Sequence, residues 1–361
     1  MISGADGEID LSLEKAKSIA LENNPDIKIQ KKNLEISTAD IIKEKGIYDP
    51  LLNFGIGYST SNIPTASTFI DSGTINEDSF DIEGGFSGRL PSGTTYEFFQ
   101  FNLTRTDTNS PLESLSPNYL TSLSFSLAQD LLKDFGKDVN NTVITVAKDN
   151  KEISIYELEN VVSDILLNVE KEYWQVIASI KNLELERKAY ELALDLERRN
   201  KIQVEVGVLP RVSVTQAQSE VAARQVDLIG SENELSKSED ILKNRLALDL
   251  YTKLKFVDEP KISETYINEE EILKTSYDNR PELKQAQLEI KKNESLKKFF
   301  SNQRLPKLSL EGKLQLRGLG GSANPNELVF SDTASEISSQ FDEASDAFSS
   351  IPQFDFPTWT I

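Results

Sequence analysis

Carboxylates are the most abundant groups in this sequence that could carry acid–base chemistry. The 361 residues include 59 Asp and Glu but no histidine and no cysteine. Without these two residue types the chain lacks the commonest general base, the usual zinc ligands and any thiol nucleophile. Acidic pairs do not stand out beside pocket-like segments, and many glutamates recur at the spacing of a helix surface. We therefore predict no catalytic, cofactor-binding or metal-binding residues, and a carboxylate-dependent hydrolase is a weak candidate.

The charge and hydropathy patterns argue against two further classes of protein. With 39 Lys and Arg the net charge is −20, which argues against binding nucleic acid, since that depends on cationic contacts to phosphates. No run of 18 apolar residues is present, so no transmembrane helix is expected. Residues 1–6 have neither the basic start nor the apolar core of a signal peptide. The expected product is an intracellular protein or a processed or truncated form.

Residues 51–127 alternate between apolar and polar side chains, as strands with two different faces do. The pattern covers four segments, residues 51–59, 80–90, 94–105 and 119–127. Leu90–Thr94 indicates a turn, and residues 60–78 and 106–118 are expected to be loops. Within the third segment the apolar face changes at Phe99, as a β-bulge would produce.

The two faces of these strands predict different surroundings. The apolar face is expected to meet lipid through Leu52, Phe54, Ile56, Tyr58, Phe80, Ile82, Phe86, Leu123 and Phe125. The polar face, which includes Asp81, Glu83 and Arg89, is expected to line a lumen. Apolar-out, polar-in strands of about ten residues are typical of transmembrane β-barrels, although half of a soluble β-sandwich would alternate in the same way. Asp81 and Glu83 could bias a pore towards cations, but ordinary solvated strand positions are the simpler interpretation.

Heptad spacing indicates two long helices. In residues 140–206 the apolar positions that lie seven apart are Ile155, Val162, Val169, Val176, Leu183 and Tyr190. After a break at Gly207 and Pro210 the spacing resumes at Val214, Val221, Leu228, Leu235 and Leu242. A strict repeat of seven keeps an apolar stripe against a partner helix. Three residues after these apolar positions in the second helix, the side chain is small or charged, as at Ala217 and Arg224. This favours a hollow assembly whose helices face water on one side. An ordinary antiparallel hairpin is the alternative.

A long internal repeat organises the chain. The stretch Asn23–Lys28 returns as Asn279–Lys284, and Pro50 and Pro306 each open a strand-like segment further on. Both prolines of the first unit return 256 residues later, from 25 to 281 and from 50 to 306. The chain would hold one complete unit, roughly residues 11–250, and the opening of a second that would lack about 145 residues.

Four stretches, in this order, resemble the TolC family of outer-membrane efflux proteins. Asn24-Pro25-Asp26-Ile27 and Arg280-Pro281-Glu282-Leu283 look like the opening of each family repeat. Asp49–Phe54 looks like the start of the first strand, and Leu123–Leu132 looks like the return from strand to helix. Val206-Gly207-Val208 looks like the helix turn at the periplasmic tip. The residues of the repeat signature are Asn24, Pro25, Asp26, Pro50, Pro281, Glu282 and Pro306.

The resemblance implies an α+β membrane fold, with long antiparallel coiled-coil hairpins forming an α-barrel and strands contributed to a shared transmembrane β-barrel. It implies a homotrimer in the outer membrane with a periplasmic extension, acting as a passive exit duct for tripartite efflux or type I secretion. The partners would be outer-membrane lipid, a periplasmic adaptor protein and, indirectly, an inner-membrane pump. The adaptor would contact the tip at Val206, Gly207, Val208 and Leu209. The alternative is a soluble coiled-coil scaffold or adaptor protein with a β-domain.

On this interpretation the chain divides into six segments. They are N-terminal helices at 11–50, barrel strands and external loops at 51–127, a long periplasmic hairpin at 128–250, a linker at 251–266, the first helices of repeat 2 at 267–305, and an incomplete start of its strands at 306–361. Residues 318–357 are rich in Ser, Asp, Asn and Gly and are expected to be loop or poorly ordered. Residues 356–361 are expected to begin a returning strand. Four strands in the first repeat depart from the family's better-known two.

Overall fold

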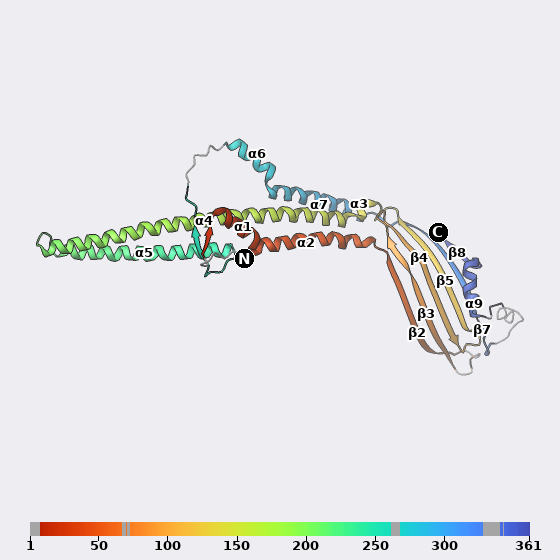
Figure 1. Cartoon of the computed structure of the whole chain (residues 1–361). Helices are drawn as coiled ribbons and strands as arrows, with labels where there is room; N and C mark the ends of the chain where they lie inside the picture. Colours follow the sequence, from red (N-terminus) through yellow and green to blue (C-terminus); the bar gives the residue numbers. More distant parts are fainter. Residues whose placement is uncertain (1–7, 67–69, 71–72, 261–267, 328–339, 342) are drawn as a thin grey trace. The chain divides into compact units, whose positions relative to one another are not determined.

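The computed structural model describes residues 8–66, 70, 73–260, 268–327, 340–341 and 343–361 (Figure 1). Parts of the expected loop at 60–78, of the linker at 251–266 and of the segment 318–357 lie outside these residues. The chain forms two compact units, one from Met1–Thr38 and Asn150–Glu289, the other from Ala39–Asp149 and Ile290–Ile361. Each unit combines distant stretches of sequence, so the division into six consecutive segments stays a prediction.

The helices have ends that follow the local sequence. Ser12 caps α1 (Leu13–Asn23), its side chain accepting a hydrogen bond from the Lys15 amide. A second helix, α2 (Pro25–Lys45), follows directly; Asn268 caps α6 (Glu269–Asn279), and α7 (Pro281–Gln303) follows. The longest pair, α4 (Thr142–Glu205) and α5 (Val212–Arg245), runs antiparallel as a hairpin (Figure 1). The two long helices predicted from heptad spacing are therefore confirmed. Helices α2, α4 and α7 each have residues in both units.

The core of the first unit surrounds Tyr173. Its fully buried members are Leu11, Ala16, Ala20, Ile27, Val169, Tyr173, Val176, Leu242 and Leu246. The Tyr173 hydroxyl lies 3.0 Å from the Leu11 carbonyl oxygen and 2.8 Å from Asp258 Oδ2. Asp258 Oδ2 also accepts the Leu13 amide at 2.7 Å. The buried tyrosine thus joins α4 to both segments that flank the small sheet of this unit.

That small sheet corrects the linker predicted at 251–266. β1 (Glu8–Leu11) pairs in parallel with β6 (Lys253–Phe256), and Leu254 and Phe256 pack against the core. Four residues are too few for alternation to distinguish a strand from a linker. The strand forms because its pairing partner, 245 residues away in the sequence, supplies the backbone hydrogen bonds.

The second unit is built on an antiparallel sheet. Among the described residues, its six strands lie in the order β2 (Leu51–Pro64), β3 (Thr74–Arg89), β4 (Thr94–Thr108), β5 (Leu115–Asp130), β7 (Ser309–Ala323) and β8 (Pro357–Thr360). The four strands predicted within 51–127 are confirmed. The predicted loops were too long, because Thr60–Pro64 pair with Thr74–Asp78 although both stretches are mostly polar. The expected returning strand at the end of the chain forms β8, with Trp359 opposite Leu314.

The bulge predicted at Phe99 is also confirmed. The pairing of β4 with β5 shifts between Glu97 and Gln100, and Phe99 has a left-handed backbone with φ of 52°. The extra residue keeps Phe98 and Phe101 on one face, since Phe98 lies opposite Phe86 and Phe101 opposite Gly84. The bulge therefore preserves the apolar face of the sheet instead of ending it.

The expectation that 318–357 is loop or poorly ordered was wrong for 318–323 and 344–353, whereas 324–327 and 354–356 do lie outside helices and strands. Residues up to Ala323 continue β7, and Ala344–Gln353 form α9, which begins with a capping box between Glu343 and Asp346. α9 lies against β7 (Figure 1), and the Thr121 hydroxyl donates to the Ala347 carbonyl oxygen. A Cβ added at Gly318 or Gly320 would collide with the backbone of α9. These glycines favour a loop when judged from the sequence, but in the structure they leave room for a helix.

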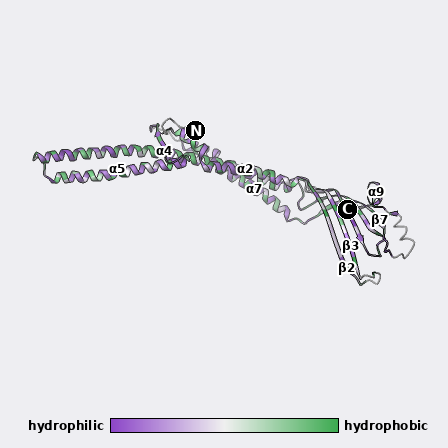
Figure 2. Cartoon of the chain, turned by 60° about the horizontal axis from the view of Figure 1, so that its bottom comes forward, coloured by the Kyte–Doolittle hydropathy of each residue, from purple (hydrophilic) through white to green (hydrophobic). Residues whose placement is uncertain are grey.

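Hydrophilic residues are distributed along the helices. Figure 2 shows purple segments interspersed with green ones along α4 and α5. In the described ranges, no helix combines the length and the apolar character that crossing a bilayer would require.

Candidate functional site

Strand pairing gathers the predicted lipid-facing residues of β2 and β3 on one face of the sheet. Leu52 lies opposite Phe86, Ile56 opposite Ile82, and Tyr58 opposite Phe80. Paired residues of an antiparallel sheet project to the same side. Their side chains meet solvent, as at Phe54, which is 72% exposed. The structure thus forms one apolar surface from residues that the sequence separates by about 30 positions.

This apolar face continues across the remaining strands. Phe101 lies opposite Leu123, which lies opposite Leu316, and Leu314 lies opposite both Phe125 and Trp359. The members that the prediction omitted are Tyr96, Phe98, Phe101, Leu103, Leu127, Leu314, Leu316 and Trp359. Alternation within β4 was visible, but the bulge obscured which residues share a face.

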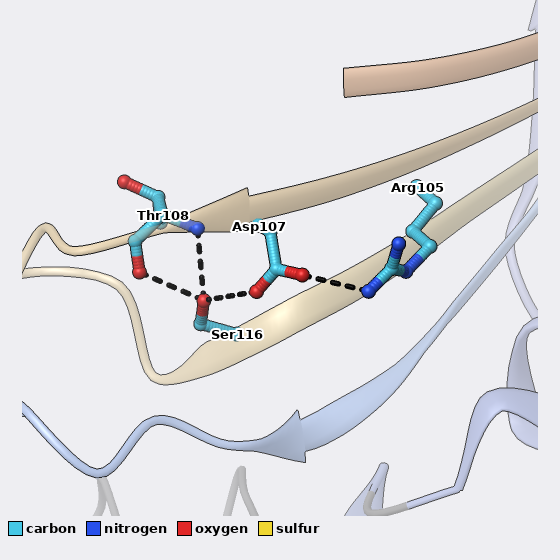
Figure 3. Close-up of polar contacts among 4 residues, drawn as sticks. All are labelled: Arg105, Asp107, Thr108 and Ser116. Carbon is cyan, nitrogen blue, oxygen red and sulfur yellow. Dashed lines mark hydrogen bonds and ion pairs between the residues drawn. The ribbon is translucent and has the colours of Figure 1, made fainter. Parts of the chain in front are cut away.

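A polar cluster marks one end of the apolar face. On β4, Arg105 lies opposite Phe80, and its guanidinium pairs with Asp107 at 2.7 Å. The Ser116 hydroxyl donates to the Thr108 carbonyl oxygen at 2.8 Å and accepts a hydrogen bond from the Thr108 amide (Figure 3). The same hydroxyl lies 3.3 Å from Asp107 Oδ1. From Leu52 to Tyr58 the apolar face of β2 extends roughly 20 Å at about 3.3 Å per residue. That is similar to the apolar band of about 25 Å on outer-membrane barrels.

The opposite face of the sheet is polar and carries the predicted lumen residues. Asp81 accepts a hydrogen bond from the Thr104 hydroxyl at 2.8 Å. Glu83 lies opposite Gly55, where a Cβ would come within 2.8 Å of Glu83 Oε1, so that glycine makes room for the carboxylate. Arg89 lies at the end of β3 and donates to Asn140 Oδ1 at 2.7 Å. The structure therefore brings Asp81 and Glu83 together on one face and places Arg89 apart from them.

The turn between α4 and α5 presents exposed valines. Val206 is 67% exposed and Val208 is 70% exposed. Gly207 has φ of 80°, the left-handed conformation that glycine adopts without strain. The Val208 amide donates to the Gln203 carbonyl at 2.8 Å and the Leu209 amide to the same oxygen at 3.2 Å, which closes the helix end. The predicted tip residues thus form a hydrogen-bonded turn with an apolar surface.

The repeat signature marks the junctions between elements. Asn24 is buried; its Oδ1 accepts the Asp26 amide at 2.9 Å and its Nδ2 donates to the Arg245 carbonyl at 3.1 Å. Pro25 and Pro281 each occupy the first position of a helix, where a missing N–H is tolerated. Pro50 precedes β2 and Pro306 precedes β7. Both copies of the motif therefore produce the same order of helix, helix and strand.

Clusters suited to a metal ion are not found in the part of the chain that the structure describes. There, no three His, Cys, Asp or Glu side chains come together in a way that could hold one.

Comparisons with known proteins agree with this architecture. A family model described as "Outer membrane efflux protein" matches residues 17–247. The structure resembles CusC (TM-score 0.61, 14% identity, covering 98% of this chain and 64% of that one). It also resembles the Campylobacter jejuni outer membrane channel CmeC (TM-score 0.61, 14% identity, covering 95% of this chain and 66% of that one). A third similar structure is the outer-membrane channel OprN (TM-score 0.60, 13% identity, covering 95% of this chain and 70% of that one). None of the curated proteins matches the sequence significantly.

These matches bear differently on family and fold. At such low identity the solved structures establish the fold alone, which is TolC-like. The chain spans about two thirds of the length of these structures, 64% in the case of CusC. The family model covers more than half of the chain and confirms the resemblance noted in the sequence. The chain belongs to the outer membrane efflux protein family.

Proposed function

We propose that the protein is an outer-membrane exit duct for tripartite efflux or type I secretion. It works as a passive conduit without bond chemistry, assembled as a homotrimer. Its proposed partners are a periplasmic adaptor protein and, indirectly, an inner-membrane pump. CmeC and OprN, which share the fold, are described as outer-membrane channels.

The observation that carries this proposal is the apolar face of the sheet. Large apolar side chains such as Phe54 are exposed along β2 and continue through β3 and β4. A water-soluble β-domain would bury such a face against a second layer. Lipid covers the exposed part of this face on β2, β3 and β4 without further protein, whereas α9 packs on the same face beside Thr121 and Gly318. The polar face with Asp81 and Glu83 lines a wet lumen.

The edges of the sheet support assembly from several copies. β2 and β8 stand at the two ends of the strand order, and neither has a second partner strand among the described residues. Unpaired backbone groups at a strand edge are too costly in hydrocarbon, so membrane sheets close into barrels. Pairing between copies of the chain would close this one, with three copies in the proposed assembly.

The tip between α4 and α5 is the proposed contact for the adaptor. Val206 and Val208 are exposed on a turn whose backbone is held by hydrogen bonds to the Gln203 carbonyl. A rigid turn with apolar side chains suits a docking surface because little conformational freedom is lost on binding.

The experiment that tests the proposal is extraction of the protein from its host's envelope, followed by its mass in detergent and its conductance in a planar bilayer. The expected result is a detergent-requiring trimer that conducts ions. A protein that is released without detergent as a monomer or dimer would overturn the channel and favour the soluble coiled-coil scaffold.

A further inference from the structure

Three lysines from three helices line one cavity of the second unit. Lys45 ends α2, Lys148 lies in the first turns of α4, and Lys298 lies near the end of α7. The cavity has a volume of about 640 Å³, within the usual range for small-molecule sites. The three side chains bring three positive charges to one opening.

These positive charges lack a matching set of carboxylates. Asp138 is the one acidic residue that lines the cavity. Other lysines of the same helices are paired, Lys43 with Glu44 at 3.7 Å and Lys291 with Asp149 at 2.8 Å. Within the described ranges no ion pair includes Lys45, Lys148 or Lys298. In a chain with a net charge of −20, the lining of this cavity is locally cationic.

Hydrogen bonds hold the walls of the cavity in place. The Tyr48 hydroxyl donates to the Asn140 carbonyl at 2.9 Å and lies 3.1 Å from Asn141 Oδ1. Burial raises the pKa of Tyr48, which keeps this hydroxyl protonated as a donor. One helical turn after Lys298, Asn302 donates to the Leu132 carbonyl at 2.9 Å and accepts the Asp134 amide at 2.7 Å, which joins the end of α7 to the segment after β5. The site is thus largely formed before any ligand binds.

An ion pair between a buried aspartate and an exposed lysine sets the position of α7 beside the cavity. Asp149 is 2% exposed, and its Oδ1 accepts from Lys291 at 2.8 Å. Asp149 follows Lys148 in sequence, and Lys291 lies two helical turns before Lys298. This pair therefore holds α4 and α7 together close to the two lysines that they contribute.

The remaining lining combines hydroxyl groups with apolar side chains. Thr145 and Ser295 lie on the wall with the lysines, while Pro91, Val139, Ile144 and Phe299 form an apolar part. Three ammonium groups can each donate to the oxygens of a phosphate, which offers more acceptor sites and charge than a carboxylate. The apolar part suits a carbon chain attached to that phosphate.

We propose that this cavity binds a phosphate-bearing anion, either a soluble phosphoester or the headgroup of a phospholipid. Lys45, Lys148 and Lys298 donate to the phosphate oxygens, and the apolar wall contacts the organic part. This goes beyond conduction, and binding of a soluble phosphoester does not depend on the proposed channel function.

The test measures binding to the detergent-solubilised full-length protein by isothermal titration calorimetry. The two probes are sn-glycerol 3-phosphate and dihexanoylphosphatidylglycerol below its micellar concentration. The variant replaces the three lysines (Lys45→Gln, Lys148→Gln and Lys298→Gln), which removes charge while keeping length. The matched control replaces one lysine outside the cavity lining on each of the same helices (Lys31→Gln, Lys151→Gln and Lys297→Gln).

We expect the cavity variant to bind at least one probe about tenfold more weakly, or worse, because it loses three charge-assisted hydrogen bonds. The control should stay within about twofold, and binding to the unchanged protein should weaken as salt is raised. If the cavity variant binds both probes more weakly, the phosphate group that they share is the ligand. Loss for the lipid probe alone assigns a phospholipid headgroup, and loss for glycerol phosphate alone assigns a soluble phosphoester.

Equal binding of both probes by the cavity variant and the control, or no binding to the unchanged protein, would overturn the proposal. Circular dichroism and the assembly state check that the triple variant folds. If it does not, the three single substitutions replace it, and each should then weaken binding about threefold or more.

Discussion

The Tyr173 hydroxyl and the Asp258 carboxylate meet at 2.8 Å in the core of the first unit, although 85 residues separate them in the sequence. Asp258 also receives the Leu13 amide, so one carboxylate joins the start of α1, the middle of α4 and the segment after β6. Burial, followed by the hydrogen bond and the charge of Asp258, raises the pKa of Tyr173 well above its ordinary value. The neutral hydroxyl is therefore the form that the folded state favours.

Replacing Tyr173 with Phe should destabilise the first unit by about 1–3 kcal/mol, because Asp258 and the Leu11 carbonyl lose the one O–H donor that they share. Because the pKa of Tyr173 is raised on folding, the hydroxyl contributes its full stabilisation at any pH below its pKa in the unfolded chain, about 10. That stabilisation is lost only as the pH rises through the higher pKa of the folded state. The loss should therefore be equal at pH 7 and pH 9. Thermal unfolding in detergent measures it, with Tyr251→Phe as the control, since Tyr251 is almost fully exposed. Equal midpoints for the two variants would contradict the role of the hydrogen bond.

A charge on the apolar face of β2 should prevent membrane assembly. We expect Phe54→Arg to cost about 2 kcal/mol or more in the bilayer and to lower the yield of trimer. Phe86→Arg on β3 should have the same effect. The matched control is Asn53→Arg, which changes the neighbouring residue on the polar face. The measurement is the amount of detergent-extracted trimer on native gels. An unchanged yield for Phe54→Arg would remove the lipid-facing assignment.

A side chain at Gly320 should displace α9 from the sheet. The Cβ of Gly320→Val would collide with the backbone of Glu343 and Ala347, whereas Gly312, on the same strand, has nothing within 4 Å of its Cβ position. Overpacking of this kind typically costs about 1–3 kcal/mol. Hydrogen exchange of residues 344–353 should accelerate in Gly320→Val and stay unchanged in Gly312→Val. Equal protection in both variants would show that α9 does not depend on this contact.

A charge at the tip should weaken docking of the adaptor while leaving assembly intact. Val208→Asp places a carboxylate on an exposed turn, so the trimer should form normally, but a proposed apolar contact would be lost. Val208→Leu keeps the surface apolar and serves as the control. Site-specific cross-linking to the adaptor in cells should fall several-fold for Val208→Asp alone. Equal cross-linking in both variants would place the adaptor contact elsewhere.

Features that depend on local periodicity were predictable from the sequence. The heptads of α4 and α5, the alternation of β2 to β5 and the bulge at Phe99 each reflect the backbone geometry of a single element. The repeat of Asn24-Pro25-Asp26 as Arg280-Pro281-Glu282 was predictable for a similar reason. It marks helix junctions at which a buried side chain or a proline determines the start of the next helix.

Features that depend on a distant partner were not predictable in this way. β6 has only four residues and becomes a strand through pairing with β1, and α9 packs where Gly318 and Gly320 leave the surface of β7 open. The cavity lined by Lys45, Lys148 and Lys298 joins residues from three helices that no spacing relates.

The sequence by itself determined the elements, their faces and the family, because each follows from side-chain periodicity and from short motifs at helix ends. Tertiary structure alone decided which strands pair, which residues complete the apolar face beyond β3, and where unpaired charges gather. Those properties depend on contacts between segments far apart in the chain, and a pattern within one segment contains no information about its partner.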